Sequence, residues 1–428
     1  MSDISYRDSE SSVLRKLTWR LVPFLFLLYV VAYLDRINVG FAALQMQRQL
    51  HFTDAVYGLG AGMFFVGYLC FQVPSNLVLQ RIGARRWIAV LMLTWGVISS
   101  AMIFVNSPRS FYAFRFLLGS AEAGFFPGVI LYLRNWFPAS ARARTVARFM
   151  TAAPIAGLIG GPISGALLNL HPRWGLGGWQ WLFLVEGVPA ILLGCIAWRY
   201  LTDRPDEAFW LPVAERNWLL DALRREKTGA TESGSNARPV LWNGKIWMLA
   251  VGYFGVTTAM YGVSMWLPNV LHSVSGVNNF TIGLLSAIPY LAASVAMVGV
   301  GLHSDQSGER RWHAALPAFV ASVALVGAAY SGSVYPSIFT ISVATLATFS
   351  MMGPFWAIPT SLLSGAEAAV GIALINSVGN LGGLFGPYVI GWVRGATSSF
   401  RGGLLAVGAA VAMSGVVVLL VRESPPQS

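Results

Sequence analysis

Hydrophobic residues recur along the whole chain in windows of about 20 residues, and polar segments separate these windows. A helix that rises about 1.5 Å per residue needs this length to cross the hydrocarbon core of a bilayer. The pattern therefore predicts an all-α membrane protein with 12 transmembrane helices. We expect the spans at about residues 19–44, 56–79, 86–105, 110–133, 146–169, 179–199, 246–271, 281–302, 313–332, 335–358, 368–393 and 402–421.

The longest polar segment, residues 200–245, divides the chain into two sets of six spans. Its charged first part predicts a short amphipathic helix, and the Gly, Ser and Thr residues that follow predict a flexible linker. The expected organisation is a polar N-terminal tail (1–18), a first six-helix bundle (19–199), the linker (200–245), a second six-helix bundle (246–421) and a short tail (422–428).

The two halves share sequence features at one constant spacing. The loop RIGARR after the second span matches QSGERR after the eighth, and their glycines, Gly83 and Gly308, are 225 positions apart. In the fifth and eleventh spans, Gly161 and Gly386 each precede a proline and are also 225 positions apart. Two independent motifs with the same offset indicate a duplicated six-helix unit, with the halves related by an axis along the membrane normal.

Composition and charge agree with this topology. Hydrophobic residues make up 55% of the chain and charged residues 11%, well below the roughly 25% of soluble proteins. Basic loops stay on the cytoplasmic side, and with both termini inside, 22 of the 29 Lys and Arg residues lie in cytoplasmic segments. We expect a multi-pass protein of a bacterial-type inner membrane with both termini in the cytoplasm. The 5 basic residues expected outside are Arg48, Arg109, Arg173, Arg394 and Arg401.

Enzyme and metal chemistry find no support in the residue pattern. The 5 histidines are not paired at ligand spacing, the 2 cysteines form no framework, and no nucleophile–base pair or soluble domain is apparent. The net charge of +11 follows from the topology, and no aromatic–basic surface indicates nucleic-acid binding. We therefore expect no catalytic residue, no metal, no cofactor and no nucleic-acid partner. The lipid bilayer is the expected environment, and a monomer should suffice for function.

The first half carries ionisable residues inside its spans, namely Asp35 and Arg36 in the first and Arg115 and Glu122 in the fourth. A charge inside the membrane costs about 2.5–3.5 kcal/mol on insertion scales, so such residues usually face a partner, a substrate or a water-filled path. Counting the helical rise places both carboxylates near mid-membrane, with Arg115 two turns from Glu122 on the same helix face. This arrangement is typical of a transporter.

The residue types predict separate roles. A carboxylate whose partner changes between conformations can load and release a proton, so Asp35 and Glu122 are the predicted proton-coupling residues. Arg36 keeps its charge and offers a planar fork to a carboxylate, which makes it the predicted anion ligand. Structural alternatives stay open: Arg115 could brace neighbouring helices by binding carbonyls or Glu122, and Asp35 could be a latch for Arg36.

The second half lacks this charge. Adding the repeat offset of 225 to the four ionisable positions gives Met260, Tyr261, Thr340 and Ala347. Coupling is therefore expected in the first half. The second half offers the neutral pair Asn376 and Asn380, one helical turn apart in the eleventh span, which could bind substrate oxygens or join helices.

Several segments resemble known families. The segment GLHSDQSGERR, residues 301–311, resembles the signature loop of the major facilitator superfamily. Within that superfamily, YLDRINVGFAAL, RFLLGSAEAGFFPGVILYLRNWFP and GWQWLFLVEGVPA are similar to the anion:cation symporter family. The resemblance implies the major facilitator fold and secondary active transport by alternating access. It also implies proton-coupled symport, with the proton gradient driving uptake of a small carboxylate such as tartrate, a sugar acid or an aromatic acid.

The resemblance also implies site residues. It favours Tyr33 and Tyr68 as substrate ligands, and it assigns Asp305 to a conformational latch with nearby basic groups, Arg81 supporting the equivalent loop of the first half. That first-half loop departs from the pattern, because Gln80 stands where the acid is expected. The glycine–proline motif of the fifth span also resembles one found in antiporters, so a proton-driven exporter stays open, as does a membrane sensor or enzyme.

Overall fold

The computed structural model describes residues 2–172, 174–230, 242–362 and 365–421. Within these ranges the regular structure is helical and no strand is present. In the same ranges 12 helices are long and apolar enough to cross a membrane, which confirms the predicted all-α fold. The predicted C-terminal tail at 422–428 and the part of the linker at 231–241 lie outside the described residues.

The first half contains six spans and the start of the linker. Its elements are α1 (Ser2–Gln49), α2 (Asp54–Ile82), α3 (Ala84–Ala101), η1 (Met102–Phe104), α4 (Pro108–Glu122), α5 (Phe125–Trp136), α6 (Ala139–Met150), α7 (Ala152–Leu168), α8 (Gly178–Tyr200), η2 (Pro205–Glu207) and α9 (Val213–Ala230). The predicted tail at 1–18 is helical from Ser2 onwards and continues directly into the first span. The linker contains a helix, α9, as its charged first part predicts.

The second half repeats the plan. Its elements are α10 (Gly244–Ser275), α11 (Asn279–Ser307), α12 (Arg311–Tyr330), α13 (Val334–Ser350), α14 (Met352–Leu362), α15 (Gly365–Asn380), α16 (Gly382–Thr397) and α17 (Arg401–Leu420). Helix breaks divide the fourth span into α4 and α5, the fifth into α6 and α7, the tenth into α13 and α14, and the eleventh into α15 and α16. The broken spans therefore occupy corresponding places in the two repeats.

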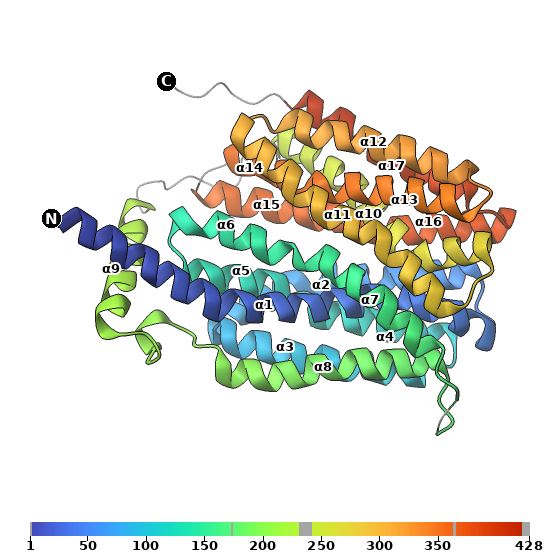
Figure 1. Ribbon diagram of the computed structural model, residues 1–428, viewed down its shortest axis with the longest axis horizontal. Coiled ribbons are helices and arrows are strands. Elements are labelled where there is room, and N and C mark those ends of the chain that lie inside the picture. Colours follow the sequence, from blue (N-terminus) through green and yellow to red (C-terminus); the bar gives the residue numbers. More distant parts are fainter. Residues whose placement is uncertain (1, 173, 231–241, 363–364, 422–428) are drawn as a thin grey trace.

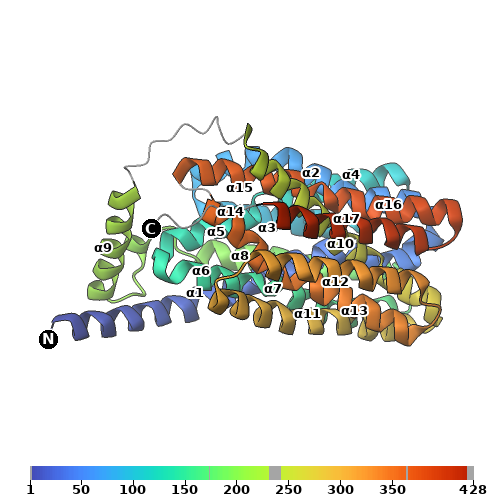
Figure 2. The same cartoon turned by 90° about the horizontal axis from the view of Figure 1, so that it is seen from above.

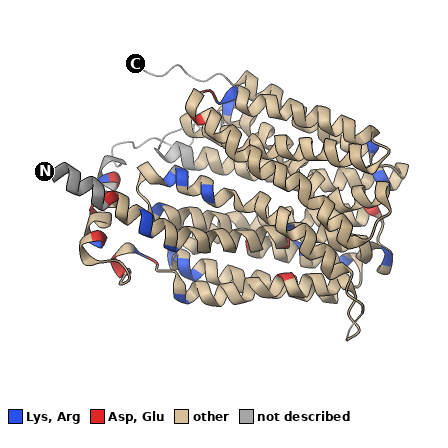
Figure 3. Ribbon diagram, viewed as in Figure 1, with Lys and Arg blue, Asp and Glu red and all other residues tan. Residues whose placement is uncertain are grey.

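The long helices lie side by side, with most of the first half in the lower part of Figure 1 and the second half in the upper part. Helix α1 begins and α17 ends at the same end of the bundle, and α9 also lies there (Figures 1 and 2). We name this the inner end and the opposite end the outer end. Figure 3 shows that Lys and Arg residues gather at the inner end. The sequence assigns most basic residues to loops on one side of the membrane, and this distribution agrees with that assignment.

Close backbone contacts join the two halves near the outer end. A Cβ atom added to Gly161 of α7 would lie 2.5 Å from the carbonyl oxygen of Gly283 in α11. The contact between α2 and α16 is equivalent, because a Cβ added to Gly58 would lie 2.6 Å from the carbonyl oxygen of Pro387. Both interfaces need glycine for this approach, since any side chain would push the helices apart. The bundle is therefore closed at its outer end.

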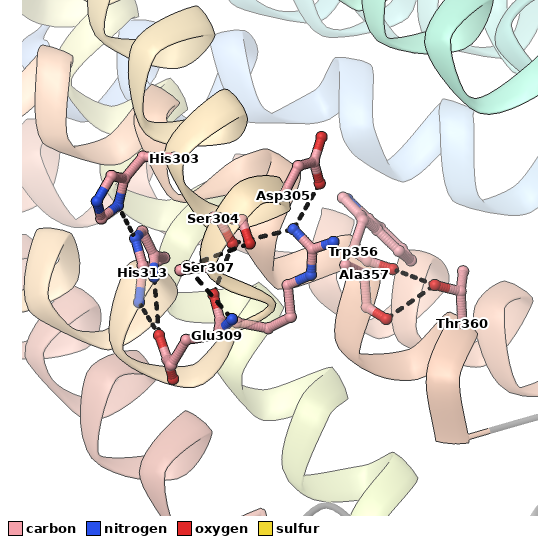
Figure 4. A network of polar contacts seen from close by, with 10 residues as sticks. His303, Ser304, Asp305, Ser307, Glu309, His313, Trp356, Ala357 and Thr360 are labelled. Carbon is pink, nitrogen blue, oxygen red and sulfur yellow. Dashed lines mark hydrogen bonds and ion pairs between the residues drawn. The ribbon is translucent and has the colours of Figure 1, made fainter. Parts of the chain in front are cut away.

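The loop between α11 and α12 forms a polar network at the inner end (Figure 4). Asp305 forms an ion pair with Arg310 at 2.6 Å. Glu309 accepts hydrogen bonds from the backbone N–H of Trp312 at 2.7 Å and of His313 at 3.1 Å, and so caps the start of α12. Burial raises the pKa of the Glu309 carboxyl, but the hydrogen bonds from Trp312 and His313 lower it more, so its pKa is below its ordinary value.

The His313 ring links this cap to His303. Its Nδ1 lies 2.8 Å from the Glu309 carboxylate, and its Nε2 lies 2.6 Å from Nδ1 of His303. The loop is thus held by its own polar groups, with the turn itself made at Gly308, whose φ is +70°.

Candidate functional site

Arg36 of α1 lies at the centre of the interface between the halves. Its Nη2 donates a hydrogen bond to Oε2 of Glu122 at 2.8 Å, and its Nη1 donates to the hydroxyl of Tyr261 at 3.1 Å. The guanidinium also faces the rings of Phe64 and Tyr68, at 5.1 and 5.6 Å from their centroids. One residue therefore connects α1 with α2 and α4 in its own half and with α10 in the other half.

Glu122 is the last residue of α4, and the break between α4 and α5 follows it directly. Its side chain is fully buried and forms its ion pair with Arg36. Its second oxygen, Oε1, has no hydrogen-bond partner in the described structure. A buried ion pair of this kind is sensitive to charge changes. Neutralising or removing one partner leaves the other as an uncompensated charge in a low-dielectric site, which is energetically costly.

Asp35 points away from this pair. Its Oδ1 accepts hydrogen bonds from Ser99 Oγ in α3 at 2.8 Å and from Asn38 Nδ2 at 3.4 Å. The side chain is fully buried between α1 and α3, and its Oδ2 has no partner in the described structure. Among the described ion pairs Asp35 has none with Arg36, so the interpretation of Asp35 as a latch for Arg36 is wrong for this conformation.

Arg115 holds α4 against α2. Its Nη2 donates a hydrogen bond to the carbonyl oxygen of Ala61 at 3.3 Å, and its guanidinium lies 5.1 Å from the centroid of Phe64. Arg36 faces the same ring at the same distance. Arg115 is fully buried, and its carbonyl contact is the one expected of a helix brace.

The predicted tyrosines line the same region to different degrees. Tyr68 faces the Arg36 guanidinium, whereas Tyr33 contacts the ring of Tyr29 edge-on at 6.4 Å. The Tyr33 hydroxyl is buried and has no hydrogen-bond partner in the described structure. Tyr29 stacks on Phe149 at 4.6 Å, so it joins the centre of α1 to α6.

Asn376 and Asn380 lie together on α15 in the second half. Asn380 Nδ2 donates to Asn376 Oδ1 at 2.9 Å, which is a bond within α15. Helix α15 packs on α10, where Thr257 donates a hydrogen bond to the carbonyl oxygen of Gly379. Their role as substrate ligands stays a prediction.

Sequence reasoning missed Tyr261 as a site residue, although the signal was present. Tyr261 is the repeat equivalent of Arg36, and the structure joins the two directly. A third buried carboxylate, Glu186 of α8, accepts a hydrogen bond from Ser164 at 2.6 Å. Glu186 and Ser164 belong to different spans, so the residue spacing along the chain does not predict their contact.

The two signature loops are supported differently. In the second half, Asp305 is paired with Arg310, a basic group of its own loop. In the first half, where Gln80 replaces the acid, Asp203 after α8 pairs with Arg85 at 3.0 Å and accepts from its backbone N–H at 3.0 Å. Arg81 is exposed at the end of α2. A carboxylate from the linker region thus supports the loop that lacks its own.

The buried charges of α1 and α4 balance one another. These two helices contribute two carboxylates, Asp35 and Glu122, and two arginines, Arg36 and Arg115, while a third buried carboxylate, Glu186, lies in α8. The formal charges of the α1 and α4 residues cancel, which limits the cost of placing them at membrane depth.

Comparison with known proteins finds relatives that cover nearly the whole chain. A family model described as "Major Facilitator Superfamily" matches residues 25–387. A protein of Agrobacterium vitis named "Putative tartrate transporter" is 46% identical over 421 residues, covering 98% of this chain and 94% of its own length. A "Quinolone resistance transporter" of Acinetobacter baumannii is 40% identical over 398 residues, covering 93% of this chain and 92% of its own.

The fold also matches solved structures. A crystal structure of a bacterial homologue of the human lysosomal transporter Spinster, in an inward-facing and occupied conformation, aligns with a TM-score of 0.76 at 17% identity. The alignment covers 94% of this chain and 96% of that one.

Proposed function

The chain belongs to the Major Facilitator Superfamily and is a multi-pass membrane transporter rather than an enzyme, and from this premise we propose that it takes up a small organic anion together with protons. The proposed substrate is a carboxylate, with tartrate as the first candidate because a relative that shares 46% identity carries that name. The proposed location is a bacterial inner membrane with both termini in the cytoplasm. A monomer without a cofactor would suffice, because the proton gradient supplies the energy.

One observation carries this proposal: Arg36 is held between a carboxylate of its own half and a hydroxyl of the other half. The guanidinium fork suits a carboxylate ligand, which would replace Glu122 on one edge of the fork. Tyr261 would stay in reach of the other edge. The substrate would then bind to Arg36, whose permanent charge lies in contact with both halves of the protein.

Charge balance supports the proposed proton coupling. Arg36 and Glu122 form an ion pair in which their formal charges cancel. If a proton enters Glu122 and a monoanion enters beside Arg36, the sum of charges is unchanged. A dianion such as tartrate needs a second proton, on Asp35 or on its own second carboxylate. The loaded site can then cross between conformations at no larger electrostatic cost than the empty one. Entry of the anion alone would leave an uncompensated negative charge inside the membrane.

Asp35 is proposed as a second coupling acid, with a different part. It faces α3, where Ser99 donates a hydrogen bond to it, rather than pairing with Arg36. A proton there would change how α1 packs on α3 rather than free Arg36. Glu122 is therefore the residue whose protonation we link directly to substrate binding, and Arg115 is the brace that fixes α4 beside it.

The second candidate function is proton-driven export. A relative named for quinolone resistance is 40% identical over 93% of this chain, so the same scaffold serves a protein with that name. In an exporter the proton and the substrate would compete for Arg36 and Glu122 instead of entering together. The direction of the proton flux that accompanies the substrate distinguishes the two functions.

The test is uptake into vesicles that contain the purified protein, with tartrate, a sugar acid and an aromatic acid as labelled substrates. Accumulation of one anion only when the outside is more acidic, with protons moving inward alongside it, supports symport. Expulsion of the compound with protons moving in the opposite direction would replace this proposal by the exporter. Vesicles without protein and vesicles with equal pH on both sides are the controls.

A further inference from the structure

A polar cavity of about 440 Å³ lies between the halves at the outer end, starting about two helical turns beyond Arg36 along α1. The ends of α1 and α10, the start of α2 and the end of α16 all contribute to its walls. Its lining residues are Ala43, Leu44, Gln47, Arg48, Phe52, Thr53, Asp54, Asn269, His272, Ser273, Arg394 and Gly395. We name this cavity the outer pocket.

Charged side chains from both halves meet in the outer pocket. Arg394 of the second half forms an ion pair with Asp54 of the first half, at 3.1 Å between Nη1 and Oδ1. Asp54 also accepts a hydrogen bond from Gln47 Nε2 at 3.1 Å. On the other side, Arg48 Nη2 lies 3.2 Å from Nε2 of His272. The pocket thus holds two permanent positive charges and one carboxylate.

Asn269 points to a ligand in this pocket independently of the charges. Its side chain is only 7% exposed, and its Nδ2 has no hydrogen-bond partner in the described structure. A buried donor without a partner is costly, so a ligand oxygen would satisfy it. Next to it, Arg394 is held in position by the rings of Trp266 and Phe400, at 5.5 and 4.2 Å from their centroids.

The two arginines are also unusual for their side of the membrane. The sequence places only 5 of 29 basic residues in outer segments, and two of these 5, Arg48 and Arg394, line this one pocket. Lys and Arg are depleted in outer loops. Two arginines and the unpartnered amide of Asn269 therefore line one outer cavity, an arrangement that suits the binding of an anion.

We propose that the outer pocket is a second anion site, which captures the incoming carboxylate at Arg394 and thereby favours opening of the outer end. This inference rests on the proposed uptake of an organic anion. When the halves separate at the outer end, Asp54 moves with the first half and Arg394 with the second, so their ion pair breaks. A carboxylate of the substrate takes the place of Asp54 on the Arg394 fork and accepts from Asn269.

The energetic consequence is a coupling between capture and opening. Closure gives Arg394 its carboxylate partner Asp54, whereas opening would leave a partly buried guanidinium without one. An anion that binds only the separated pair stabilises the open state by its own binding free energy. The pocket then acts as an anion-sensitive gate in series with the central Arg36 site.

Transport kinetics test the proposal through paired substitutions. Arg394→Gln should raise KM for the external anion at least tenfold with a smaller change in the maximal rate, and Arg394→Lys should lie between because it keeps the charge but not the fork. Asp54→Asn should leave KM unchanged or lower it, because it removes the competing carboxylate. Arg401→Gln is the matched control: it removes another outer charge, one that stacks on Tyr330 outside the pocket, and should change KM less than twofold.

A binding measurement separates this inference from the proposed function. In a Cys70→Ser and Cys195→Ser background, Ser273→Cys places a thiol in the wall of the pocket. In detergent, tartrate should slow its reaction with a maleimide, potassium chloride of equal ionic strength should not, and Arg394→Gln should abolish the protection. Protection without uptake of any anion would overturn the proposed function but not the pocket. Uptake without protection, and with an unchanged KM in Arg394→Gln, would overturn the pocket.

Discussion

Arg36 and Tyr261 are hydrogen-bonded to each other and are separated by 225 positions, the offset that relates the two halves. Residues exchanged by a twofold relation can touch only if both lie close to its axis. One helical turn away, Gly40 and Met265 have the same separation, and a Cβ added to Gly40 would lie 2.9 Å from the Met265 carbonyl oxygen. The axis therefore passes through the crossing of α1 and α10, and the charged site lies on it.

Tyr261→Phe should weaken the closed outer end. The substitution removes the acceptor of a hydrogen bond from Arg36 that crosses between the halves, and a bond of this kind contributes about 1 kcal/mol net. The outward-open population should rise roughly fivefold. Spin-label distances between outer loops of the two halves measure this change.

The control for Tyr261→Phe is Tyr335→Phe, because Tyr335 is 86% exposed and its hydroxyl can bind water in every conformation. It should leave the distance distribution unchanged. If Tyr261→Phe also leaves it unchanged, the bond to Arg36 carries no weight in the equilibrium between conformations.

Arg36→Lys should reduce uptake even though it preserves the charge. An ammonium group cannot bind Glu122 and Tyr261 through two fixed donors as the guanidinium does, and it fits a substrate carboxylate at one point rather than two. We expect kcat/KM for uptake to fall at least tenfold. Arg401→Lys, at an exposed outer position, is the control, and equal losses in both variants would contradict a special role for Arg36.

The number of spans and the duplication were predictable because they depend on apolar length and on a constant offset between motifs. The direction in which each side chain of α1 points was not predictable. The middle of α1 is buried around its circumference, so no polar face distinguishes the side of Asp35 from that of Arg36, and their assignment to α3 and to the central site needed the packed structure. Tyr261 was accessible through the offset, but a neutral residue gave no reason to select it.

The positions of the helix breaks and the contacts of the linker region could not be predicted from the sequence, for other reasons. The break after Glu122 lies inside a predicted span, and at this break Gly124 approaches Ser75 so closely that a Cβ would leave no room. Asp203 supports a loop 118 positions away through Arg85. Such contacts are set by the packing of whole helices, which hydropathy does not encode.

Glu122→Gln should separate exchange from accumulation. The amide keeps the shape of the side chain but removes the group that is proposed to carry the proton, so the gradient can no longer drive uptake. Exchange of labelled for unlabelled anion at equal pH should persist within about threefold, whereas gradient-driven accumulation should disappear. Both are measured with the same vesicles.

Glu186→Gln is the matched control for Glu122→Gln, because Glu186 is a buried carboxylate that accepts a hydrogen bond from a serine, Ser164, where Glu122 pairs with an arginine. It should retain gradient-driven accumulation. Accumulation against a gradient in Glu122→Gln would remove Glu122 as the coupling acid and leave Asp35 as the candidate.

Glu309→Gln should lower stability at neutral pH by about 0.3–1 kcal/mol, or up to about 1 °C in Tm for a chain of this length, because the charged cap of α12 is lost from a partly exposed site. The pKa of the Glu309 carboxyl is lower in the folded protein than in the unfolded chain, so its stabilisation is present above the unfolded value. It is lost as the pH falls through the folded value. The Tm difference from the native chain should therefore shrink in acid.

Glu207→Gln, at an exposed position, provides the baseline for the Glu309 measurement. A Tm difference for Glu309→Gln that stays constant from neutral pH to below the ordinary glutamate range would show that the carboxylate charge does not stabilise this loop.

Gly161→Ala should prevent closure of the outer end without unfolding the bundle. The new Cβ would lie 2.5 Å from the carbonyl oxygen of Gly283, a backbone atom that cannot move aside without shifting α11. Gly299→Ala, on the exposed side of α11, is the control, because a Cβ there meets nothing within 4 Å. Helix propensity alone would stabilise both variants by up to about 1 kcal/mol, so only the contact distinguishes them. We expect transport to fall more than tenfold in Gly161→Ala alone, with the thiol of Ser273→Cys reacting faster because the outer pocket stays open. Equal transport in the two variants would mean that the outer end closes without the α7–α11 contact.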